Sequence, residues 1–125
     1  MKLKNRNMRI LKGLYIYQSK KFPVKILFFT TSATVLCSAA VINYEASFFQ
    51  IVAAFFSIMF FLFHVRVIDE YRDYKDDAEY HPENPVHYGT ISLKQLFLTD
   101  LIGLIFIAFI SIYYGNGTTI FAIAL

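Results

Sequence analysis

The amino-acid sequence predicts an all-α protein, a multi-span transmembrane helical bundle with about three spans and the start of a fourth. Hydrophobic residues fill 57% of the 125 positions. A water-soluble domain of this length rarely has so apolar a composition, because much of its surface must face water. Three apolar runs come close to the roughly 20 residues that cross a bilayer core as a helix, and the charged residues alternate with them along the chain.

The apolar runs cover residues 26–44, 46–65 and 96–114. We expect helices because a helix satisfies its own backbone in lipid, and no run alternates as a barrel strand does. The first two runs are joined by very few residues, so they must form an antiparallel hairpin. A fourth apolar run, 118–125, stops after eight residues, and we therefore expect the sequence to be a piece of a longer chain.

Residues 1–25 are predicted to form a basic cytoplasmic leader. Their sequence interleaves apolar side chains with lysines, which suits a helix lying on an anionic membrane surface. Pro23 then marks the start of the first span. Alternatively, the run 26–44 is a cleaved signal peptide, because small residues of the kind found at cleavage sites follow the apolar part of this run. The spans that come directly after it favour a retained helix.

The basic residues predict the orientation in the membrane. Eight of the twelve precede the first span, and the other four flank or occupy residues 66–95. The short connection 43–47 has none. By the positive-inside rule, the N-terminus and the segment 66–95 are cytoplasmic, in an integral, multi-pass membrane protein whose transmembrane domain covers 26–125. Because topology explains the basic residues, we expect no nucleic-acid partner.

Seven of the nine carboxylates lie between residues 69 and 83. No Gly or Pro precedes Tyr80 in this segment, so we expect the second span to continue as a helix to that residue. Residues 81–89 contain two prolines and a glycine and are expected to form a loop. Thr90 or Ser92 is the expected N-cap of the helix that leads into the third span.

On a continuous helix, four aspartates share one face with Glu70 beside them: Asp69, Asp73, Asp76 and Asp77. Like charges three and four residues apart repel, so such acids need solvent, paired bases or a cation. Pairing with Arg66, Arg72 and Lys75 would make an ordinary solvated surface. Alternatively, a carboxylate-only cluster suits a hard cation such as Mg²⁺, and the same three bases would then contact the phosphate oxygens of a diphosphate.

The stretch "DEYRDYKDD" (69–77) resembles the first aspartate-rich motif of the UbiA superfamily of intramembrane prenyltransferases, N-D-x-x-D-x-x-x-D. The loop "ENPVHYG" (83–89) is similar to that family's N-R-P-L-x-x-G in outline. Asp69 and Glu70 replace the initial Asn-Asp pair, and Asn84 stands where the loop usually has arginine. The resemblance implies these ligands for the metal: Asp69, Glu70, Asp73 and Asp77.

The family resemblance implies Mg²⁺-dependent transfer of a prenyl group from an isoprenyl diphosphate to a lipophilic, often aromatic acceptor within the membrane. It also implies about nine spans and a second D-x-x-x-D motif, which this sequence does not contain. We therefore expect residues 1–125 to be inactive alone. The alternative function is that of a small non-catalytic membrane protein whose acids form a solvated collar.

Three further residues have simpler explanations. Cys37 and His64 are expected to fill space within the first two spans or at their edge. Asp100 lies about one turn inside the third span, where it either snorkels to the interface with help from Lys94 or lines a polar cavity.

Overall fold

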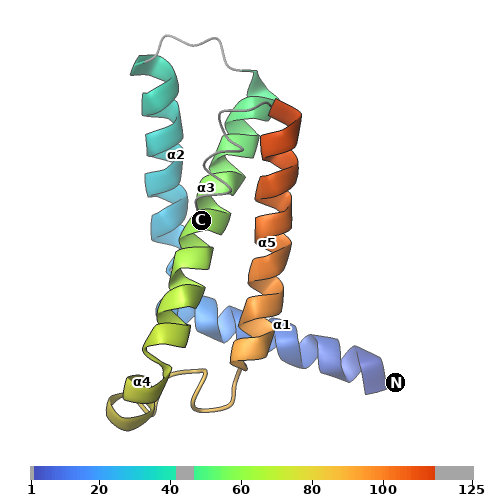
Figure 1. Cartoon of the computed structure of the whole chain (residues 1–125), viewed down its shortest axis with the longest axis vertical. Coiled ribbons are helices and arrows are strands. Elements are labelled where there is room, and N and C mark those ends of the chain that lie inside the picture. The colour runs from blue at the N-terminus through green and yellow to red at the C-terminus, as the bar shows by residue number, and fades with distance from the viewer. Residues whose placement is uncertain (1, 42–46, 115–125) are drawn as a thin grey trace.

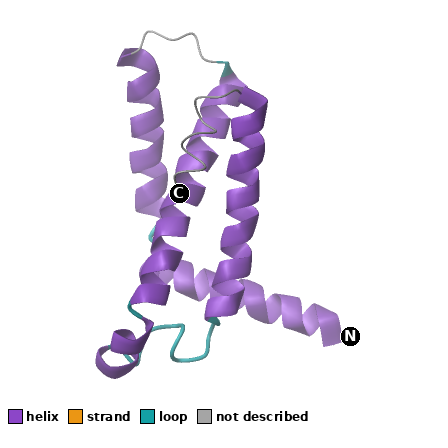
Figure 2. Cartoon of the chain, in the orientation of Figure 1, coloured by secondary structure: helices purple, strands orange, loops and turns teal. Residues whose placement is uncertain are grey.

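The computed structural model describes residues 2–41 and 47–114, and it confirms the all-α prediction. The described residues form helices and no strand (Figure 2). The elements are α1 (Lys2–Lys21), α2 (Val24–Val41), α3 (Phe48–Arg72), α4 (Tyr74–Tyr80) and α5 (Leu93–Tyr114). The last residues of the first apolar run, 42–44, and the fourth apolar run lie outside the described residues.

Three of these helices, α2, α3 and α5, are long and apolar enough to cross a membrane, as predicted. They run side by side, and α3 packs against both of the others (Figure 1). The contact between α3 and α5 is close at Gly103, where an added Cβ would lie 2.8 Å from Cδ1 of Phe60. Most large side chains of the three helices remain exposed, which is expected of helices that face lipid or further helices.

The helix boundaries follow from local chemistry. Pro23 directly precedes α2, as predicted. Ser47 begins α3 with a capping box, in which its side chain and that of Gln50 each bond the other's backbone. The same arrangement joins Ser92 and Gln95 at the start of α5, so Ser92, rather than Thr90, is the cap.

Helix α1 lies across the end of the bundle near α4 and the loop before α5 (Figure 1). It is part of the protein core at this end: Tyr17 is 1% exposed, and it shares one buried cluster with residues of α3, the loop and α5. Gly13 permits the close approach, because an added Cβ would lie 2.6 Å from the carbonyl oxygen of Thr90.

The expectation of one continuous helix to Tyr80 is wrong. α3 ends at Arg72, Asp73 has φ −91° and ψ 4°, and α4 follows. The Asp73 amide still donates a helical hydrogen bond of 2.9 Å to the backbone carbonyl of Asp69. The chain therefore bends at Asp73 without losing this bond. A straight helix would hold Glu70 and Asp77 about 10 Å apart along its axis. The break between α3 and α4 allows Glu70 and Asp77 to contact the same loop residue, Asn84.

Candidate functional site

The acids at the end of α3 and in α4 separate into two groups. The inner group is built around Glu70 and Asp77, which converge on the side chain of Asn84, and it also includes Arg66, Lys21 and Tyr17. The amide nitrogen of Asn84 donates to Oε2 of Glu70 at 3.0 Å and to Oδ2 of Asp77 at 2.7 Å. Glu70 and Asn84 are almost fully buried, at 3% and 1% exposure. One amide therefore holds two carboxylate oxygens close together.

Each inner carboxylate also faces a cation. The Arg66 guanidinium donates to Oε1 of Glu70 at 2.8 Å, from one turn earlier on α3. Lys21, the last residue of α1, places its Nζ 3.6 Å from Oδ2 of Asp77. Pairing of this kind offsets the repulsion between two partly desolvated carboxylates. The inner group therefore brings together residues from α1, α3, α4 and the loop before α5.

Tyr17 is the other α1 residue at this site. Burial raises the pKa of Tyr17 well above its ordinary value, and the negative charge of Glu70 raises it further. The buried Tyr17 hydroxyl and the Nε of Arg66 have no hydrogen-bond partner among the described residues. Both groups can donate a hydrogen bond. The inner group thus includes two buried donors that lack a protein acceptor.

The outer group consists of Asp69 and Asp73, which are held by Arg72. Arg72 lies 3.1 Å from Oδ1 of Asp69, and its Nε donates to Oδ1 of Asp73 at 2.9 Å. The hydrogen bond from Arg72 lowers the pKa of Asp73 below its ordinary value. Lys75 and Asp76 are exposed to solvent on α4. This part of the cluster has the geometry of a solvated surface with paired charges.

The predicted metal ligands are therefore not gathered at one point. Within residues 2–41 and 47–114, no three acidic, histidine or cysteine side chains meet in a group that could hold a metal ion. The two inner carboxylates are nevertheless compatible with Mg²⁺, which typically takes one or two protein carboxylates and completes its shell with water and phosphate. Of the three predicted diphosphate contacts, Arg66 lies in the inner group, with its guanidinium also 3.9 Å from Asp69 of the outer group, whereas Arg72 and Lys75 are not in the inner group.

Three residues of the inner group were not predicted as site residues from the sequence: Asn84, Tyr17 and Lys21. In the sequence, Asn84 is only a replacement for the arginine of the resembling motif, and residues 1–25 have the pattern of a separate leader. Gly13 is the one local signal for the docking of α1, since a glycine within an otherwise good helix often has a packing reason. No local pattern indicates that Asn84 reaches Glu70, fourteen residues earlier.

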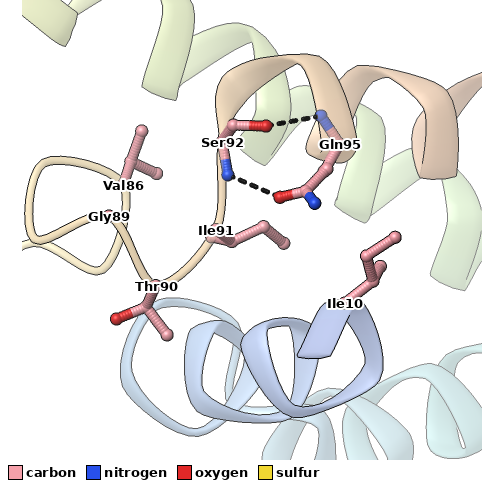
Figure 3. Close-up of a pocket in the computed structure, with 7 residues that line it drawn as sticks. All are labelled: Ile10, Val86, Gly89, Thr90, Ile91, Ser92 and Gln95. Carbon is pink, nitrogen blue, oxygen red and sulfur yellow. Dashed lines mark hydrogen bonds between the residues drawn. The ribbon is translucent and has the colours of Figure 1, made fainter. Parts of the chain in front are cut away.

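The loop before α5 packs against α1 beside the inner group. A cavity of about 320 Å³ lies between the two, and Figure 3 shows the seven residues that line it. Ser92 and Gln95 bond each other on one side of it, and Ile10 of α1 faces them across the space. None of the described residues that line this cavity is an acid, so the cavity is distinct from the two carboxylate groups.

Asp100 has the second of its two expected environments, because it lines a cavity between α3 and α5. It is 2% exposed, so the snorkelling interpretation is wrong, and its Oδ2 lies 2.7 Å from Nδ1 of His64 on α3. His64 therefore has a polar partner, whereas the sequence suggested only packing.

Comparison of the chain with protein-family models, with curated proteins and with solved structures finds no match. The fold alone does not define an activity, since one helical architecture can carry many functions. Function must therefore be inferred from the side chains gathered at the end of the bundle and from their chemistry.

Proposed function

We propose that this chain takes part in Mg²⁺-dependent transfer of a prenyl group from an isoprenyl diphosphate to a lipophilic, often aromatic acceptor within the membrane. The observation that carries the proposal is the convergence of Glu70 and Asp77 on Asn84 at the end of a helix long enough to span a bilayer. Ionisable groups in such a place are expensive and are usually functional. The motif resemblance over residues 69–77 supports the same chemistry.

Magnesium would be held by Glu70 and Asp77 in this proposal. Their shared amide keeps two carboxylate oxygens close, and both residues keep a cation nearby that limits their repulsion. When bound, magnesium would neutralise the negative charge of the diphosphate leaving group. Asp69 and Asp73 remain predicted ligands from the motif, although Arg72 holds them in the outer group.

The diphosphate would lie against Arg66, Lys21 and Tyr17. Arg66 and Tyr17 each have a buried donor without a protein acceptor, and a phosphate oxygen is a strong acceptor that would satisfy both. Lys21 adds a positive charge from α1. These residues would bind and orient the substrate, while the apolar prenyl chain would extend along the spanning helices.

The charge distribution supports a cytoplasmic position for this site. Helix α1, which carries most of the basic residues, lies at the same end of the bundle as α4 (Figure 1). A cytoplasmic α1 would also place its exposed lysines against anionic lipid headgroups. A water-soluble diphosphate headgroup would reach the site from the cytoplasm, and a lipophilic acceptor would reach it from the membrane.

A second candidate function is that of a non-catalytic membrane protein with a solvated acidic collar. The observation that favours it is the pairing of Arg72 with both Asp69 and Asp73 at an exposed position. Paired surface charges of this kind need no ligand, and their net contribution to stability is small. This alternative explains the outer group but leaves the two buried donors of the inner group without an acceptor.

Equilibrium binding of farnesyl diphosphate to the full chain in lipid nanodiscs tests the proposal, measured by calorimetry with Mg²⁺ and with EDTA. We expect binding to require Mg²⁺ and to weaken about tenfold or more in Asp77→Asn, which removes a charged ligand but can still accept from Asn84. The control is Asp76→Asn, a neighbouring exposed acid that should bind as the unmodified chain does. Equal binding with EDTA would contradict the role of Mg²⁺, and the absence of saturable binding would favour the collar.

A further inference from the structure

A second polar site lies between α3 and α5, apart from the acidic groups. A cavity of about 350 Å³ is lined there by His64, Val67, Ile68, Tyr71, Phe97 and Asp100. His64 faces a different side of α3 from Glu70, because six residues turn a helix through about one and two-thirds turns. The cavity is therefore not part of the proposed diphosphate site.

The polar atoms that the His64–Asp100 pair leaves for a ligand are hydrogen-bond acceptors when the ring is neutral. Nδ1 of His64 lies 2.7 Å from Oδ2 of Asp100, so the Nδ1–H donates to the carboxylate when the ring is neutral and this tautomer is present. Nε2 of the ring then accepts. The other carboxylate oxygen, Oδ1, is buried and has no partner among the described residues. The pair thus offers two acceptors, one of them on a fully buried carboxylate.

Among the residues that the structure describes, no side chain supplies the missing donor. The Tyr71 hydroxyl donates to the carbonyl of Leu93, at 3.5 Å, and Lys94 is exposed. The other walls of the cavity are aliphatic or aromatic, with the rings of Tyr71 and Phe97 edge to face at 6.5 Å between centroids. A buried carboxylate oxygen without a donor is costly, which points to a ligand that brings one.

The cavity borders the surface of the membrane-spanning helices. Ile68, Tyr71 and Phe97 each expose between 47% and 48% of their area. These residues belong to, or lie at the ends of, α3 and α5, whose apolar surfaces suit lipid. A ligand entering between them would come from the membrane and would need an apolar body.

We propose that this cavity binds the hydroxyl-bearing end of a membrane-soluble alcohol or phenol. The hydroxyl would donate to Oδ1 of Asp100, and the apolar body would lie against Phe97 and Tyr71 toward the lipid. The site does not depend on prenyl transfer by the acidic groups, since it uses none of their residues. An alcohol and a phenol share the required donor, and the test separates them.

The test is a titration of the full chain, labelled with ¹⁵N at histidine, in lipid nanodiscs. The probes are 4-octylphenol, 1-decanol and 4-octylanisole, the last being the phenol with its hydroxyl methylated. We expect the ¹⁵N signals of His64 to shift and saturate with the phenol or the alcohol, but not with the ether. Asp100→Asn should weaken the effective probe about tenfold or more, because a charged acceptor becomes a neutral one; Asp76→Asn should not.

Two outcomes would overturn the proposal. Saturation by the ether as well would mean that the cavity takes apolar molecules without regard to a donor. No saturable shift with any probe would mean that the His64–Asp100 pair is structural or is bridged by water. Both comparisons use the unmodified chain, so they stand even if Asp100→Asn fails to fold.

Discussion

Asn84 donates a hydrogen bond of 3.0 Å to the carboxylate of Glu70, and both residues are almost fully buried. The bond ties the loop before α5 to the last turns of α3. The carbonyl oxygen of the same side chain accepts from the Val86 amide at 3.2 Å, which fixes the loop residue itself. The position of Glu70, at the centre of the proposed site, therefore depends on Asn84.

Replacing Asn84 with alanine should destabilise the protein by about 1–3 kcal/mol, because it leaves a buried carboxylate oxygen without its donor. Thermal unfolding in detergent, followed by circular dichroism, measures the change. Glu83→Ala is the matched control, since the Glu83 side chain is 72% exposed beside the same loop turn. Equal melting temperatures for the two variants would show that the Asn84 bonds contribute little.

Replacing Gly13 with alanine should also destabilise the protein, by about 1–3 kcal/mol, since a methyl group would lie 2.6 Å from a backbone oxygen. The direction of the stability change is informative, because within an isolated helix alanine is about 1 kcal/mol more favourable than glycine. Limited proteolysis should show α1 released from the bundle. Lys12→Ala, at an exposed position of the same helix, serves as control. A more stable Gly13→Ala protein would contradict the docked position of α1.

Tyr17 should remain protonated when an ordinary tyrosine, with a pKa of about 10, ionises. Its raised pKa means that its contribution to stability is complete below that pH and is lost as the pH rises further. Tyrosinate absorbance, compared between the unmodified chain and Tyr17→Phe, isolates its titration. Glu70→Gln should lower the Tyr17 pKa by removing a nearby charge, whereas Glu79→Gln should leave it unchanged. Ionisation of Tyr17 at its ordinary pKa would place it outside the buried cluster.

The spans were predictable because their signal is local. Composition and length alone place the starts of α2, α3 and α5 within three residues of the starts of the predicted runs. Ser92 and Pro23 likewise act through their immediate neighbours. The break at Asp73 was not predictable in this way, because the residues around it all tolerate a helix and the bend depends on what the distant loop holds.

The candidate site was predictable only in part. The identity and spacing of the acids indicated a cluster, but in the structure Glu70 and Asp77 form one group, Asp69 and Asp73 form another, and Asp76 belongs to neither. Asn84 and Tyr17 join the inner group through contacts across fourteen and more than fifty residues. Such contacts depend on tertiary packing, and no periodic pattern in the sequence indicates them.

Paramagnetic broadening by Mn²⁺, used in place of Mg²⁺ with inorganic diphosphate, tests the position of the metal most directly. We expect the NMR signals of the Asn84 side-chain amide, which bonds both inner carboxylates, to broaden more than the Nε–H signal of Arg72, which bonds the outer group. Asp77→Asn should abolish the difference. Stronger broadening at Arg72, or none at either residue, would contradict a metal held by Glu70 and Asp77.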